Sequence, residues 1–528
     1  MVVALVVAVL AVALGLALGL APGARRRALG PLRTMAVTAV IAVIAVHLLP
    51  EALAELGWVG LALFAVALAA PRWLRLVTRT PEAVSEARHV GLELGFWGLV
   101  VHHVGDGLAL GAYSHVDEAT GRAHTDVLLA LVLHTVPLVA VISAAYARAW
   151  GVKSALVRGA VLALASCAGV LAARLPSSHT VEHGQAWIAA GVAGLLLHGI
   201  THDLGEDLPD STATRALDLL AAVFGGGFGW LGATLDTHVE AEFSFALGAS
   251  FSRAVERTAL PLLLGLVIAS AVASRWPATG DDLISRLRRA AFRVGFGIES
   301  LLVASVQLGV PIALAIHALA LGLLAASLGP DQLRPEPRGF AACFVARLDR
   351  FGVWALAALT MSIVIEAGVP AAELSRLNAW ALLVAIAWVG VGLPLPAIAA
   401  LLVAHALAGK ALPVSSTLLF GAWLPAADSV VRARRWLLVP LALLACAGLG
   451  SFLTPAGVAI DARLGWVAGA ALLALMLVRI YLVGLRGWIA PLAPHVHTGA
   501  AGRSTQRSAQ LEHDGQGGEH GLPAQKRR

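Results

Sequence analysis

Residues 100–113 place two imidazoles and one carboxylate in an otherwise apolar stretch, VVHHVGDGLALGAY. On a helix, His102 and Asp106 are four residues apart and His103 and Asp106 are three apart, so all three side chains can point towards one ion. Ionisable groups are costly inside a bilayer and usually serve a function there. The neighbouring glycines let another backbone come close. The spacing therefore predicts a metal site, and the alternative is a His–Asp pair that only joins helices.

Three other predicted helices carry residues of the same types. One is predicted to end near residue 49, with His47 and Glu51 four residues apart around a proline. Another carries His134 beside a proline, and a third ends with His198 and His202 on one face. A single histidine near a helix end is more often hydrogen-bonded to a carbonyl than bound to a metal. Together, however, these helices favour a shared pathway for a cation.

The composition indicates that these helices lie in a membrane. Of 528 residues, 59% are hydrophobic and 13% are charged, and the mean hydropathy is +0.82. An average soluble domain has roughly 25% charged residues. Apolar stretches of about 20 residues, each long enough to cross about 30 Å of hydrocarbon, recur along most of the chain. We therefore predict an all-α, polytopic integral membrane protein with about 15–17 transmembrane helices in two bundles, by the hydropathy rule.

The charges and the cysteines exclude several other classes of protein. The net charge of +6 comes from Lys and Arg in short loops beside apolar stretches, which the positive-inside rule explains without a nucleic-acid partner. Cys167, Cys343 and Cys446 form no CxxC pair, so neither a disulfide framework nor a thiolate zinc site is expected. The expected partners are a metal cation and the lipid bilayer, and a homodimer is left open.

Basic loops orient the first half of the chain. The loops at residues 25–33, 72–88 and 148–158 follow the first, third and fifth predicted spans, which places them in the cytoplasm and the N-terminus outside. The apolar N-terminal stretch lacks a basic n-region and a cleavage site, so it is predicted to be a retained span. Eight spans are expected by residue 235. The C-terminus is expected in the cytoplasm, and the membrane is expected to be a bacterial inner (plasma) membrane.

Residues 1–238 resemble the ZIP zinc and iron permeases. The resemblance rests on HLLPEA from residue 47, HHVGDGLALGA from residue 102 and HTVP from residue 134, which occur in the family's order. It implies an eight-helix metal transport domain with N-terminus outside. It also implies ligands at His102, Asp106 and His134, with His103 where the family usually has asparagine.

The sequence departs from the ZIP pattern in two predicted spans. Thr135 and Leu138 stand where the family has acidic or histidine ligands, and the sixth span, residues 155–173, contains no carboxylate. A site for two metals is therefore not expected. Imidazoles with one carboxylate suit zinc, copper, nickel or iron better than magnesium or calcium.

Residues 239–490 form a second predicted module. Residues 295–328 and 379–427 are interrupted by Gly and Pro at matching places, which is typical of a transporter repeat, although two unrelated kinked helices would give the same pattern. In residues 256–265, 396–405 and 421–428 this half resembles the two-repeat permeases that include arsenic and copper/zinc efflux proteins, with residues 297–300 where their cysteine motif would be. Five polar residues in this half are candidates for a transport site, and for each the alternative is that it only bonds one helix to another. They are Glu299, Gln307, His317, His405 and Asp428. Residues 491–528 form a polar, His-containing tail that is expected to be disordered.

These patterns predict a transporter of divalent transition-metal cations, zinc first, with no enzymatic chemistry and no prosthetic group. The metal is the substrate, and the proposed path runs from the ends of the first bundle to its middle. Two alternatives stay open. In one, the first bundle is a metal-sensing domain attached to an efflux permease. In the other, the chain is an intramembrane zinc-dependent hydrolase, although no HExxH motif is present.

Overall fold

The described residues of the protein are mainly helical. The computed structural model describes residues 2–20, 29–78, 83–113, 125–173, 212–235, 241–278, 280–328, 337–370 and 374–492, and residues 186–198 with gaps at 188, 192 and 196. Within these residues no strand occurs. The predicted class, an all-α polytopic membrane protein, is confirmed.

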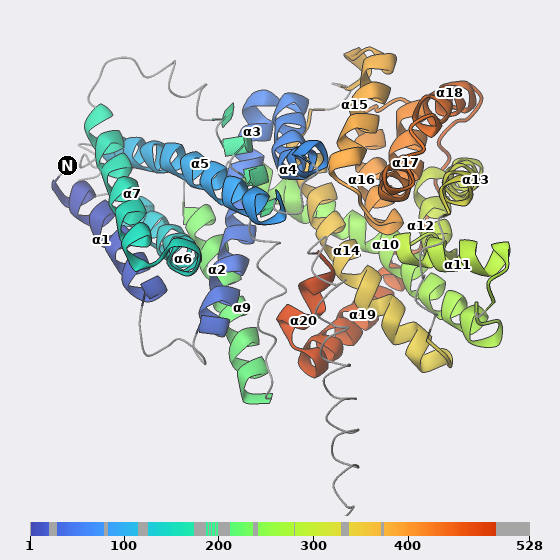
Figure 1. Ribbon diagram of the computed structural model, residues 1–528, viewed down its shortest axis with the longest axis horizontal. Helices are drawn as coiled ribbons and strands as arrows, with labels where there is room; N and C mark the ends of the chain where they lie inside the picture. The colour runs from blue at the N-terminus through green and yellow to red at the C-terminus, as the bar shows by residue number, and fades with distance from the viewer. Residues whose placement is uncertain are drawn as a thin grey trace, which may run out of the picture.

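The helices of the first half gather on one side of the molecule, at the left of Figure 1. They are α1 (Val2–Leu20), α2 (Leu29–Val43), α3 (Leu49–Leu56), α4 (Trp58–Thr78), α5 (Ala83–Tyr113), α6 (Thr125–Trp150), α7 (Val152–Ala172) and α9 (Thr212–Leu235). Among the described residues, the closest helix pairs are α2 with α9, α5 with α7, and α1 with α6.

The segment around His47 differs from its prediction. A π-helical turn, Ile44–Leu48, contains His47 and joins α2 to α3 without a break. The helix therefore continues beyond the predicted end of the span near residue 49, to Leu56, and ends at Gly57, whose φ is +57°. A π turn widens the backbone ladder, so it accommodates Pro50, which has no N–H to donate.

The second half forms the other side of the molecule. Its helices are α10 (Ala241–Arg275), α11 (Leu283–Val294), α12 (Ile298–Leu308), α13 (Val310–Ser327), α14 (Phe340–Gly368), α15 (Ala379–Gly392), α16 (Ala397–Gly409), α17 (Val414–Arg432), α18 (Leu438–Gly450), α19 (Ala462–Val483) and α20 (Leu485–Ile489). Short 3-10 turns lie at Leu374–Arg376 and Ala490–Leu492. Helices α3 and α4 of the first half lie near the centre of the molecule, against the second half (Figure 1).

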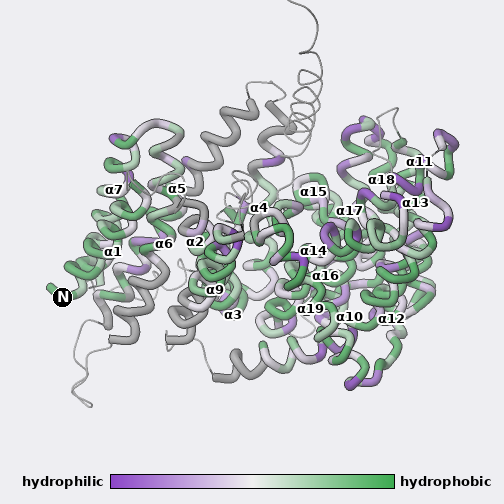
Figure 2. Tube along the Cα trace, turned by 90° about the horizontal axis from the view of Figure 1, so that it is seen from below, coloured by the Kyte–Doolittle hydropathy of each residue, from purple (hydrophilic) through white to green (hydrophobic). Residues whose placement is uncertain are grey.

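Long apolar helices with apolar side chains on their outer surface identify an integral membrane protein. Among the described residues, seven helices are long and apolar enough to cross a bilayer, and the pair α11 and α12, bent by 59°, could form one more. Val467 and Leu473 on α19 are more than half exposed, as expected for side chains that face lipid. Figure 2 shows hydrophobic residues along most of these helices. The total of 15–17 spans stays a prediction, because this count covers only the described residues.

Helices α10 to α13 and α14 to α17 pack as two similar sets. Helix α10 contacts α12 as α14 contacts α16, and α11 contacts α13 as α15 contacts α17. Three helices also contact their counterparts across the sets, in the pairs α10 with α14, α12 with α16, and α13 with α17. This is the contact pattern of two repeats that face each other, with the short helices α12 and α16 near the middle.

The two halves meet through α3 and α4 on one side and α14, α15 and α17 on the other. The Arg72 guanidinium on α4 pairs with the Asp428 carboxylate on α17, and Arg72 is buried. The rings of Trp73 and Trp388 lie 5.5 Å apart. One cluster of buried apolar residues runs through both halves. The two predicted modules therefore share a packed interface.

Candidate functional site

Helix α5, which carries His102, His103 and Asp106, is held against α7 by close backbone contact. A Cβ atom added to Gly107 would lie 2.1 Å from the carbonyl oxygen of Ser166. A Cβ on Gly169 would lie 2.1 Å from the carbonyl oxygen of Val104. Real Cβ atoms do not approach an oxygen this closely, so the helices can pack this way only with glycine at these positions. The prediction that a glycine beside Asp106 admits a neighbouring backbone is confirmed at Gly107.

Replacing Gly107 by alanine is expected to destabilise the protein by about 1–3 kcal/mol, because α5 and α7 must separate to admit the methyl group. The measurement is the thermal unfolding of the purified protein in detergent. Gly226→Ala on α9 is the matched control, since a Cβ there meets no atom within 4 Å. An equal loss of stability in both variants would contradict the close packing of α5 against α7.

The predicted ligands on α5 share one carboxylate. The Nε2 atom of His102 lies 3.5 Å from Oδ1 of Asp106, and the Nδ1 atom of His103 lies 3.8 Å from Oδ2. The side chains of His102, His103 and Asp106 are 10%, 1% and 11% exposed. Each imidazole therefore approaches a different oxygen of one nearly enclosed carboxylate, and these distances agree with the helical spacing of residues 102–106.

His103 also bonds to the neighbouring helix. Its Nδ1 atom lies 3.2 Å from the Ser166 hydroxyl on α7. The ring centroids of His102 and His103 are 6.1 Å apart, with an angle of 51° between the ring planes. Within the described part of the chain, no three His, Cys, Asp or Glu side chains converge as a group that could hold a metal ion. The arrangement thus gives His102 and Asp106 the better position to bind a cation, while His103 joins α5 to α7.

The other predicted site residues have different outcomes. The Nδ1 atom of His198 lies 3.1 Å from the carbonyl oxygen of Leu68 on α4, which is the helix-to-helix bond expected for a lone histidine. The remaining predictions lie outside the described residues: these are the side chains of His47, Glu51 and His134, and residue His202.

In the second half, three of the singled-out residues bond helices together. Glu299 on α12 is fully buried and accepts a hydrogen bond of 3.0 Å from Arg347 on α14. The Nε2 atom of His317 on α13 lies 3.0 Å from the Ser300 hydroxyl on α12. Asp428 pairs with Arg72 across the interface between the halves. These contacts favour a structural role for all three residues.

Gln307 and His405 have a different setting, because they line a small cavity. It lies between α10 and α12 of one helix set and α14 and α16 of the other. The sequence did not single out the other polar residues around it, which come from positions more than 100 residues apart. The only signal was two arginines one turn apart near the start of an apolar helix. The polar residues of the lining that the sequence did not single out are Arg253, Arg257, Thr258, Ser362 and Glu366.

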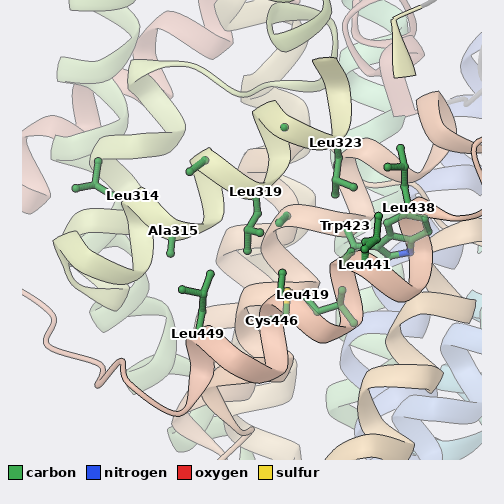
Figure 3. A pocket seen from close by; sticks show the side chains of 15 residues that line it. Leu314, Ala315, Leu319, Leu323, Leu419, Trp423, Leu438, Leu441, Cys446 and Leu449 are labelled. Carbon is green, nitrogen blue, oxygen red and sulfur yellow. The ribbon is translucent and has the colours of Figure 1, made fainter. Parts of the chain in front are cut away.

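A larger hollow lies between α13, α17 and α18, as Figure 3 shows. Its volume is about 600 Å³, and its lining is apolar apart from the buried thiol of Cys446. Leu314, Leu319 and Leu441 point into it (Figure 3). The hollow offers no carboxylate, imidazole or amide to hold an ion, so it contributes no candidate transport site.

No family model matches the chain, and neither does any curated protein or solved structure. The functional argument therefore depends on the polar groups on α5 and at the centre of the second half.

Proposed function

We propose that the chain is an integral membrane transporter whose first half carries divalent transition-metal cations, with zinc as the main substrate. The proposal is supported by a carboxylate shared by two imidazoles inside an apolar helix. Holding ionisable groups away from water costs free energy, so such groups inside a membrane usually serve a function such as ion binding. The set of imidazole nitrogens and one carboxylate oxygen matches the preference of zinc and its neighbours.

The separation of His102 from Asp106 is the observation that carries the proposal. The 3.5 Å between Nε2 and Oδ1 is longer than an ordinary hydrogen bond. Two ligands on a tetrahedral zinc ion, each about 2.0–2.2 Å from the metal, lie about 3.4 Å apart. Zinc can therefore enter between these two atoms with little movement of either side chain. Asp106 would offset part of the charge of the ion.

In the proposed transport cycle, α5 and α7 move as one unit, because their backbones are in direct contact at Gly107 and Gly169. Rocking of this pair against the other helices would open the ion site to each side of the membrane in turn. The proposed orientation has the N-terminus outside and the C-terminus in the cytoplasm of a bacterial inner membrane, as the basic loops indicate.

A metal-sensing first half is the second candidate. It is favoured by the interface between the halves, where Arg72 on α4 is buried against Asp428 on α17. A change of shape in the first half would reach the second half through this ion pair.

Uptake of labelled zinc, nickel, copper and iron into proteoliposomes containing the full-length chain tests the proposal. We expect saturable uptake of zinc that is strongly reduced in His102→Ala. Zinc binding without uptake would favour the sensing function. If the full-length chain does not bind any of the four metals, both candidates are wrong.

A further inference from the structure

The cavity at the centre of the second half has a polar floor. Gln307 is 7% exposed, and its Nε2 atom donates a hydrogen bond of 2.8 Å to the Thr258 hydroxyl. Its Oε1 atom is buried, and no hydrogen-bond partner for it occurs among the described residues. The His405 ring on the facing helix α16 lines the same cavity. A buried amide with one end unsatisfied indicates that a further polar group belongs in this cavity.

The amide of Gln307 can present either of its ends to the cavity. A hydroxyl donates as readily as it accepts, so exchanging the amide oxygen and nitrogen keeps the bond to Thr258. In that orientation the Thr258 hydroxyl donates to Oε1, and the Nε2 group points into the cavity as a donor. The floor can therefore donate a hydrogen bond to a bound acceptor.

Positive charge dominates the rim of the cavity. Arg253 lies 3.5 Å from Glu366, so one cation is paired with the only carboxylate of the described lining. No acidic side chain in the described part of the chain pairs with Arg257. The lining thus carries two arginines and one carboxylate, and such an excess of positive charge attracts anions and repels cations.

We propose that a small inorganic oxyanion, with sulfate and phosphate as the candidates, binds at the mouth of this cavity, whose enclosed volume is about 30 Å³, as a substrate of the second half. Arg257 supplies a guanidinium that can donate two parallel hydrogen bonds to such an ion. Gln307 donates from the floor. This site does not depend on the proposed metal transport by the first half.

The position of the cavity suits a transport site. Gln307 and Glu299 lie eight residues apart on α12, about 12 Å along the helix. Buried Val303 and Ala304 lie between them, so an apolar layer separates the cavity from the Glu299–Arg347 pair. A cavity at the meeting of two repeats, open to one side and closed by an apolar layer on the other, is the arrangement expected for alternating access.

Equilibrium dialysis of the purified full-length chain against radiolabelled sulfate and phosphate, at constant ionic strength, tests this proposal. We expect saturable binding of at least one of the two ions. Arg257→Gln should weaken the binding about tenfold, because a charge-assisted hydrogen bond is lost. Arg257→Lys should recover part of it. Gln307→Glu keeps the shape of the side chain but places a carboxylate in the floor, so it should remove binding.

Arg463→Gln is the matched control, because it removes an exposed arginine outside the cavity lining. It should leave the binding of both ions unchanged. Since Gln307→Glu alters a buried position, elution as a single monodisperse species is required of that variant, and the Arg257 variants test the site at an exposed position. If the unmodified chain binds neither ion, or if Arg257→Gln binds as tightly as the unmodified chain, the proposal is wrong.

Discussion

Replacing His102 or Asp106 by alanine is expected to abolish zinc binding by the purified full-length chain. The two side chains face each other at 3.5 Å, so each variant removes one side of the site. Losing one ligand of a small site leaves the ion with too few strong donors. Isothermal titration of the detergent-solubilised protein with zinc measures both the affinity and the number of ions bound.

His405→Ala is the matched control for this experiment. It removes an imidazole from the second half, where the side chain lines the cavity between the repeats. We expect its zinc binding to equal that of the unmodified chain. Retention of full stoichiometry and affinity in both His102→Ala and Asp106→Ala would exclude the metal site on α5.

The spacing of residues along α5 predicted which of its own side chains lie close together. His102, His103 and Asp106 are neighbours because a helix turns every 3.6 residues, whatever packs against it. The close approach of another backbone at Gly107 was also predictable, since only glycine permits it. The partner of His103 was not predictable, because Ser166 is an ordinary residue 63 positions away.

Contacts between residues far apart in the sequence also explain why the roles of polar residues in the second half could not be predicted. Glu299, Gln307 and His405 look alike in the sequence, as polar residues in apolar helices. Their surroundings differ because a distant arginine forms a buried ion pair with only one of them. Arg347 neutralises Glu299, whereas Gln307 and His405 face a cavity. Which polar residue holds helices together and which lines a site is decided by tertiary contacts, so the sequence left both readings open.

The ion pair between Glu299 and Arg347 provides the second prediction of large effect. Glu299 is fully buried and Arg347 is 6% exposed, and the guanidinium also stacks over Phe292 at 4.8 Å from the ring centre. Arg347→Leu leaves a carboxylate in an apolar core without this cation. We expect this single change to destabilise the protein by about 3–5 kcal/mol, measured as SDS-induced loss of helical circular dichroism.

The double variant Glu299→Leu, Arg347→Leu should recover most of that loss, because two apolar side chains in place of a buried pair leave no uncompensated charge. Arg479→Leu is the control. Arg479 on α19 pairs with Asp349, which lies on the same helix as Arg347, through hydrogen bonds of 2.9 and 2.7 Å. This pair is more exposed than the Glu299–Arg347 pair. The Asp349 carboxylate is less buried than that of Glu299, so the effect of that change should be clearly smaller. The prediction is wrong if Arg347→Leu destabilises the protein no more than Arg479→Leu does, or if the double variant is as unstable as the single one. In either case burial of the charge would not determine how much this pair contributes to stability.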